Sequence, residues 1–336
     1  MELREKLLRG IDVGRATGLE IGALCNPIVS KSDGDIRYVD HASTEDLREK
    51  YADDPAVDIE RIVAVDYVWG EKTLAQITGG SRFDYIVASH VIEHVPDLVT
   101  WVHELLSVLA PGGSIRLAVP DRRFTFDYLR QESRLSDILH AYLQRARRPL
   151  PICVLDYHLS HVHVDCVQAW DGTLDTTRLQ HKFTFGQAME LARDALDNGA
   201  YHDGHCWVFT PYSFADIFEK LNANGLLHVA CSDFADTERY RFEFVVAMTP
   251  AADRQSAIES WRAVKRRCTD GAEFPATATT APRPESPEPE PGPGPGPGTG
   301  TGAGPRADDT AKPVARTRLA SLLGRWSSRL PRGPGS

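Results

Sequence analysis

The sequence predicts an α/β fold whose centre is a doubly wound, mostly parallel sheet of seven strands. Short apolar segments alternate with helical patterns along the first 120 residues, and strands that are joined by helices run parallel. Glu20 and Gly22 close the first apolar segment, and Asp40 closes the second. The chain of 336 residues is 42% hydrophobic, which is enough to bury one substantial core. Polar residues at neighbouring strand ends predict a ligand site at that edge of the sheet.

The order of the elements follows from the spacing of the apolar residues. Helices are expected at 2–9, 97–109 and 212–224, the last ended by Gly225. The seven strands are expected near 18–22, 36–40, 62–66, 83–88, 113–119, 226–232 and 240–248. The folded sheet should therefore be complete by Thr249.

The stretch 121–206 is much longer than an ordinary connection, whose median length is about 4–6 residues, and it is interpreted as an insertion. Helical patterns are expected near 125–146 and 184–197, and alternation over 156–165 predicts an extended segment. The insertion holds His158, His161, His163, His181, His202 and His205. Because it follows the fifth strand, we expect it to cover the ligand-binding edge as a lid and to form the acceptor pocket.

The loop after the first strand indicates a nucleoside ligand that has no pyrophosphate. Dinucleotide loops carry three glycines, so that backbone amides can approach the pyrophosphate, whereas Ala-Leu-Cys-Asn follows Gly22 at 23–26. Asp40 is placed to accept the hydroxyls of a ribose. S-Adenosylmethionine (SAM) has a ribose diol and an amino acid but no phosphate. The pocket therefore favours SAM over NAD.

Four motifs in this order resemble class I SAM-dependent methyltransferases of the type 11 kind. They are Glu20-x-Gly22, Asp40, the strand-to-helix segment 83–95, and Pro111-Gly112-Gly113 before the fifth strand. The resemblance covers roughly residues 16–120. It implies a Rossmann-like methyltransferase sheet whose last two strands form a partly antiparallel edge. It also implies that SAM is bound by Glu20, Gly22, Asp40, Asp66, Ser89 and His90. A catalytically silent SAM-binding scaffold is the alternative.

Three residues after the fourth strand suggest the chemistry. If 90–94 is helical, His90, Glu93 and His94 share one face. This pattern is similar to the Glu-x-x-Glu-His metal motif of small-RNA 2′-O-methyltransferases and, in related form, of ubiquinone-pathway O-methyltransferases. The resemblance implies a divalent metal held by His90, Glu93, His94 and the downstream His205. A histidine in place of the first carboxylate favours Zn²⁺, Fe²⁺ or Mn²⁺ over Mg²⁺. Metal-free general-base catalysis by His90, His94 or His205 is the alternative.

The segment 119–127 resembles uncharacterised methyltransferases that are associated with glycosyltransferases of surface-polysaccharide or secondary-metabolite pathways. The resemblance implies O-methylation of a sugar or small-molecule hydroxyl, with Arg122 and Arg123 as candidate contacts for a phosphate or uronate. The alternative function is that of an RNA 2′-O-methyltransferase with a metal site. Residues 276–336 carry eight Lys or Arg and five Asp or Glu, a net charge of +3. Because the whole chain has a net charge of −9, residues 1–275 carry −12. Such an acidic core disfavours nucleic acid as a partner.

The composition divides the chain into three parts. Residues 1–270 are expected to form the methyltransferase domain, 271–312 a disordered Pro/Gly-rich linker, and 313–336 a basic, amphipathic helical tail that contacts a membrane or a protein. Six cysteines without a C-x-x-C pair or a secretory signal indicate a cytoplasmic location. No apolar run reaches the ~18 residues that are needed to span a bilayer.

Overall fold

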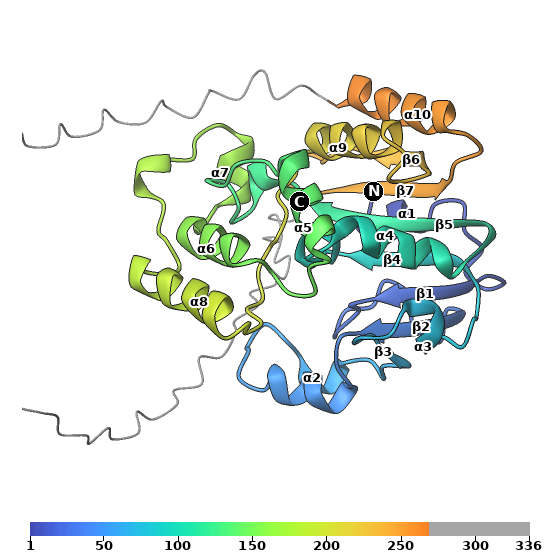
Figure 1. Cartoon of the computed structure of the whole chain (residues 1–336), viewed down its shortest axis with the longest axis horizontal. Coiled ribbons are helices and arrows are strands. Elements are labelled where there is room, and N and C mark those ends of the chain that lie inside the picture. Colours follow the sequence, from blue (N-terminus) through green and yellow to red (C-terminus); the bar gives the residue numbers. More distant parts are fainter. Residues whose placement is uncertain (269–336) are drawn as a thin grey trace, which may run out of the picture. The chain divides into compact units, whose positions relative to one another are not determined.

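A computed structural model describes residues 1–268, and the predicted linker at 271–312 and tail at 313–336 lie outside the described residues. The centre is a seven-stranded sheet in the order β3-β2-β1-β4-β5-β7-β6 (Figure 1). Its strands are β1 (Thr17–Ile21), β2 (Asp35–Asp40), β3 (Tyr67–Val68), β4 (Phe83–Ser89), β5 (Leu109–Pro120), β6 (Val229–Ala235) and β7 (Glu243–Pro250). The pairs among β1 to β5 are parallel, and β7 runs antiparallel to both β5 and β6. The predicted fold class is confirmed.

The sheet forms because its central strands are apolar on both faces. In β4 the residues 85–88 are all buried, as expected for a parallel strand that is covered by helices on both sides. The flanking helices are α1 (Leu3–Leu7), α2 (Thr44–Lys50), α3 (Leu74–Ile77), α4 (Leu98–Ser107), α9 (Pro211–Ala223) and α10 (Arg254–Arg267), with the short 3-10 turn η1 (Ile59–Arg61). No helix in the described part of the chain is long and apolar enough to cross a membrane.

The fold extends past Thr249, where we expected it to end. Helix α10 packs on α9 and β6, and Trp261 is fully buried between them. The indole N–H of Trp261 donates to the carbonyl oxygen of Val229 at 2.9 Å. This helix completes the cover of the antiparallel edge of the sheet.

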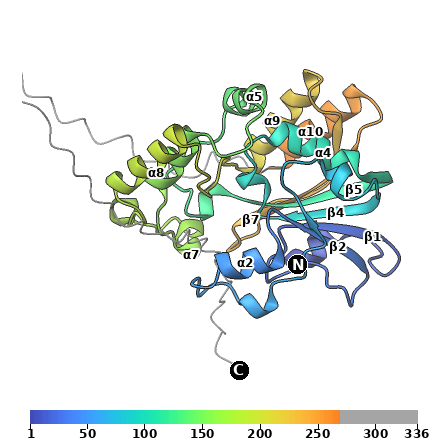
Figure 2. The same ribbon diagram turned by 60° about the horizontal axis from the view of Figure 1, so that its bottom comes forward.

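The insertion consists of the 3-10 turns η3 (Arg122–Phe124) and η4 (Thr176–Arg178) with α5 (Leu135–Gln144), α6 (Pro151–Ser160), α7 (Cys166–Trp170) and α8 (Phe185–Asp197). In both views α7 and α8 lie beyond one end of the sheet, away from α10 (Figures 1 and 2). The helix predicted over 125–146 is shorter, and the extended segment predicted over 156–165 is wrong in its first half. Residues 156–160 are the end of α6, because the helix is buried on one face, at Val154, Tyr157 and His158.

Candidate active site

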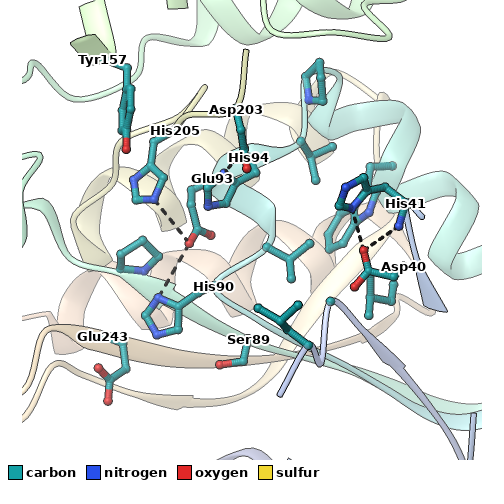
Figure 3. Close-up of a pocket in the computed structure, with 18 of the residues that line it drawn as sticks. Asp40, His41, Ser89, His90, Glu93, His94, Tyr157, Asp203, His205 and Glu243 are labelled. Atoms are coloured by element: carbon teal, nitrogen blue, oxygen red, sulfur yellow. Dashed lines mark hydrogen bonds and ion pairs between the residues drawn. The ribbon is translucent and has the colours of Figure 1, made fainter. Parts of the chain in front are cut away.

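A cleft of about 1440 Å³ opens at the carboxyl ends of the central strands. The residues after β1 and β4 and the last residue of β2 line it, and so does the insertion through Tyr157 and His161. Figure 3 shows Asp40 and Ser89 at this edge, with Tyr157 approaching from the insertion. The predicted position of the ligand site at the strand ends agrees with this cleft, and the insertion supplies part of its wall.

Gly22 makes the sharp turn that brings the backbone to the cleft. Its φ is +69°, and a Cβ at this position would meet Cγ2 of Val91 at 2.9 Å. Both facts require glycine, because left-handed backbone is unfavourable for other residues and Val91 leaves no room. The loop thus offers a bare backbone cradle with no further glycines, which fits a ligand that has an amino acid rather than a pyrophosphate.

Glu20 stabilises this loop through hydrogen bonds and does not line the cleft. Its buried carboxylate accepts hydrogen bonds from the backbone amides of Ile28 at 2.7 Å and Val29 at 3.0 Å. The structure gives Glu20 a structural role in this loop, whereas its contact with the cofactor stays a prediction. The carboxylate holds the loop shut, because it satisfies two amides that the turn would otherwise leave without partners.

Asp66 also lies outside the cleft lining. The third strand begins at Tyr67 rather than ending at residue 66, so Asp66 precedes the strand instead of facing the ligand edge. Its carboxylate binds Lys31 Nζ at 2.8 Å and accepts from the Tyr38 amide at 2.8 Å. The predicted contact of Asp66 with the cofactor is therefore not supported, and its carboxylate instead connects the start of β3 to β2.

Asp40 ends β2, and its side chain faces the cleft. Its Oδ1 accepts from the His41 amide at 2.7 Å, and His41 Nδ1 lies 2.6 Å from the same oxygen. The carboxylate is thereby held at the strand end, as Figure 3 shows. A carboxylate offers about four acceptor positions in all, so this anchoring leaves acceptor capacity for a ribose diol.

We expect Asp40→Ala to weaken SAM binding by about 10- to 100-fold, because hydrogen bonds to a charged group contribute roughly 1.5–3 kcal/mol. Titration calorimetry measures the loss. Asp35→Ala is the matched control, since Asp35 begins the same strand at the opposite end and is exposed. Equal affinity of the two folded variants would contradict the role of Asp40.

The residues after β4 do not form the helical face that the sequence suggested. His90 has a φ of +56°, and only residues 92–94 form a 3-10 turn, η2 (Ile92–His94). The side chains nevertheless converge, because the fully buried Glu93 lies between two imidazoles. Its Oε1 is 3.7 Å from His90 Nδ1 and 3.9 Å from His205 Nε2. Figure 3 shows both approaches.

His205 reaches this turn because its own segment is bound to η2 through the backbone. The amides of Cys206 and Trp207 donate to the Glu93 carbonyl at 2.6 and 3.1 Å. The indole N–H of Trp207 donates to the carbonyl of Val95 at 2.6 Å. These bonds connect two segments more than 100 residues apart, and they bring the ring of His205 within 4.7 Å of the His94 ring, measured between centroids.

Each of these two imidazoles is oriented by a buried carboxylate. His205 Nδ1 lies 2.5 Å from Asp127 Oδ2, and His94 Nδ1 lies 3.0 Å from Asp203 Oδ1. Burial opposes ionisation of Asp127, but the charges of His205 and Arg130 outweigh it and lower its pKa. Burial likewise opposes ionisation of Asp203, and the charge of His94 keeps its pKa low. An ionised carboxylate only accepts, so Nδ1 of each ring carries a proton in both protonation states of the ring. When the ring is neutral, Nε2 is its basic nitrogen.

Three of the four predicted metal ligands form one cluster. The ligand atoms of Glu93, His94 and His205 all lie within 4.8 Å of one another, whereas His90 is outside this group. The donor set fits a divalent metal, because metal-binding histidines usually donate their other ring N–H to a carboxylate, and both rings do so here. Two imidazoles and one carboxylate suit Zn²⁺, Fe²⁺ or Mn²⁺ better than Mg²⁺.

The other histidines and arginines that the sequence singled out fall into two groups. His161 and His163 line the cleft, whereas His158, Arg122 and Arg123 do not. His161 stacks on Phe126 at 4.3 Å, and burial, with the charge of Lys182 adding to it, lowers its pKa to about 3. Such a ring is a weak base near neutral pH.

Arg122 and Arg123, the predicted contacts for a phosphate or uronate, lie outside the cleft lining. Arg123 binds Asp121 through two nitrogens, and Arg122 donates to the carbonyl of Tyr128. Both guanidinium groups therefore stabilise the start of the insertion.

Sequence reasoning missed the two carboxylates that orient the imidazoles. Asp127 follows η3 in the insertion, and Asp203 stands two residues before His205. Asp203 could have been found, because an acidic residue so close to a candidate ligand is a natural partner. Asp127 is 78 residues away from its histidine, so only the fold brings the two together.

A doubly wound sheet with a glycine turn after β1, an acid at the end of β2 and a covered cleft at the strand ends is the arrangement of a class I methyltransferase. The family described as "Methyltransferase domain" matches residues 4–228, and the chain belongs to this family. The protein is a SAM-dependent methyltransferase, as the motifs predicted.

Solved structures with a similar fold share little sequence with this chain. A Rhodobacter sphaeroides protein described among Zn-dependent alcohol dehydrogenases is 15% identical, with a TM-score of 0.41, over 74% of this chain and 89% of the other. The CcbJ methyltransferase of Streptomyces caelestis is 13% identical, with a TM-score of 0.38, over 74% and 89%. DhpI in complex with SAH is 13% identical, with a TM-score of 0.34, over 73% and 81%. All three TM-scores are below 0.5, so the family match assigns the class. No curated protein matches the sequence.

Proposed function

We propose that the protein transfers the methyl group of SAM to a hydroxyl of a sugar or other small molecule. The observation that carries the proposal is the orientation of His205 in the cleft. Its Nδ1 is bound to the buried Asp127, and its Nε2 faces Glu93. A hydroxyl must lose its proton as it attacks, and an imidazole with a fixed basic nitrogen is suited to accept that proton.

The roles of the residues follow from their places around the cleft. SAM supplies a methyl group that is already activated by positive sulfur, so holding the acceptor in line accounts for much of the rate. Asp40 holds the ribose at the end of β2, and the backbone after Gly22 approaches the amino acid part. The insertion covers the cleft through Tyr157 and His161 and keeps water from the reacting groups.

The same cluster can also hold a divalent ion. Glu93, His94 and His205 would be its ligands, and the ion would lower the pKa of an acceptor hydroxyl. The metal-free route uses the imidazole alone as the base. The two routes share the orienting carboxylates Asp127 and Asp203, and they differ in whether metal removal affects turnover.

The decisive experiment measures methyl transfer from labelled SAM to a panel of hydroxyl acceptors that includes sugars, nucleotide sugars and a short RNA. Mass spectrometry of the products identifies the methylated atom. We expect turnover on a small hydroxyl acceptor.

Dialysis against a chelator, followed by addition of single metals, separates the two routes. Activity that is lost and then restored indicates the metal route, and unchanged activity indicates the metal-free base. SAM binding without turnover on any acceptor would favour the silent scaffold. Methylation of a nitrogen alone would refute the proposal.

A further inference from the structure

Glu243 lies at the cleft on the side away from the ribose position. It is the first residue of β7 and pairs with Pro120, the last residue of β5. In the strand order, β7 and β2 each lie two strands from β4, in opposite directions. At a strand spacing of about 4.8 Å, Glu243 and Asp40 flank the end of β4 from roughly 10 Å on either side. Figure 3 shows them on opposite sides of Ser89.

This position belongs to the acceptor half of the cleft. If Asp40 binds the ribose, the cofactor occupies the side of β1 and β2. In-line transfer then requires the acceptor to approach from the opposite side, over β5 and β7. His90 lies between these halves, since it follows β4 directly and its ring is 5.7 Å from that of Phe242, which precedes Glu243.

The side chain of Glu243 is buried, and its carboxylate forms no ion pair within the described residues. The residue is 7% exposed and still lines the cleft. Within residues 1–268 it forms no ion pair and no hydrogen bond to a side chain. The two cations that act on it have other partners: Arg241 pairs with Glu2 at 3.6 Å, and Lys6 pairs with Glu238 at 3.1 Å.

The residues that directly adjoin this carboxylate in the sheet are apolar. Pro120, its pairing partner, and Phe242, its neighbour in the chain, line the cleft beside it. Burial raises the pKa of Glu243, although the charges of Arg241 and Lys6 and a backbone bond from Phe242 oppose the shift. An enclosed carboxylate is costly unless a cation or several donors pair with it. A ligand that brings a positive charge removes this cost.

We propose that Glu243 selects the acceptor by binding a protonated amino group. The inference rests on the proposed function, because it names the acceptor of that same reaction as an amine-bearing small molecule. A hydroxyl could also donate to the carboxylate, but only an ammonium group adds Coulomb attraction, which is strengthened where water is excluded. The amino group would fix the acceptor at β7, and a hydroxyl on the same molecule would face His205.

The test compares two probes that differ by one amino group, methyl β-D-glucosaminide and methyl β-D-glucoside. Saturation-transfer NMR titrations are made with S-adenosylhomocysteine present. We expect the wild-type protein to bind the amino probe more tightly, and Glu243→Gln to weaken that binding by about 10- to 100-fold and abolish the preference. Glu71→Gln is the matched control, because Glu71 is an exposed carboxylate that lines the cleft and does not act on Glu243, so the variant should keep the preference. No binding of the amino probe, or equal binding of both, overturns the inference.

Calorimetry with SAM separates this inference from the proposed function. Glu243→Gln should bind SAM as the wild type does, which also shows that the variant is folded. A loss of SAM affinity would place Glu243 in the cofactor half and overturn the inference. If the amino preference depends on Glu243 while no hydroxyl is methylated, the acceptor assignment stands and the proposed reaction fails. If a hydroxyl is methylated and the protein shows no preference for the amino probe, the proposed reaction stands and the inference about Glu243 fails.

Discussion

His205→Ala is expected to lower the turnover number by about 10²- to 10⁴-fold, the usual contribution of a positioned acid or base. SAM affinity should change little, because Asp40 and the Gly22 loop, which form the cofactor half, remain. The loss should be this large because the ring is bound to Asp127 and lies against Phe126 at 4.7 Å, which fix its position in the cleft. Single-turnover kinetics with saturating SAM measures the effect directly.

His202→Ala is the matched control for this prediction. His202 lies three residues away, but its Nε2 binds Asp194 of α8 at 2.8 Å and does not line the cleft. We expect the control to retain wild-type turnover. His94→Ala should resemble His205→Ala if both rings hold a metal, with metal content and rate falling together. An active His205→Ala variant would exclude the cluster from the chemistry.

The fold was largely predictable because the central strands of the sheet are continuous apolar segments of the sequence. β1, β2 and β4 were placed within one or two residues, since strands that are buried on both faces allow few polar positions. Helix α10 was missed because most of its circumference is polar or charged. Only Ala257, Ile258, Trp261 and Val264 are buried in it, and such a narrow stripe is a weak signal.

The site was predictable only where its residues are close in the sequence. Glu93 and His94 were recognised because they directly follow a buried strand, and His205 because it lies in a distinctive histidine-rich segment. The expected helical face failed at His90, whose backbone turns left-handed immediately after β4. Contacts from the insertion and from β7 depend on how distant segments pack. The sequence around Asp127 therefore gave no sign of its role, and Glu243 was marked only as a single acid in an apolar strand.

Asp127→Asn is expected to lower turnover, and metal affinity where a metal is bound, by about 10- to 100-fold, as is typical for groups that orient a ligand. The replacement keeps the shape but removes the charge, and an amide can donate to Nδ1 of His205 as well as accept from it. The ring can then take the other tautomer, in which Nε2 carries the proton and is no longer basic. The fall should appear in kcat, with KM for SAM nearly unchanged.

The structure supplies a control that separates this effect from general damage. The buried Arg130 binds both Asp127, at 2.9 Å, and Asp156, at 2.7 Å. Asp156→Asn therefore disturbs the same arginine without touching His205, and about half of the Asp156 side chain is exposed, so its loss costs less. We expect both variants to lose stability on urea unfolding, and only Asp127→Asn to lose turnover strongly. Equal losses of turnover would mean that Arg130 maintains the fold of the insertion and that Asp127 does not set the tautomer of His205.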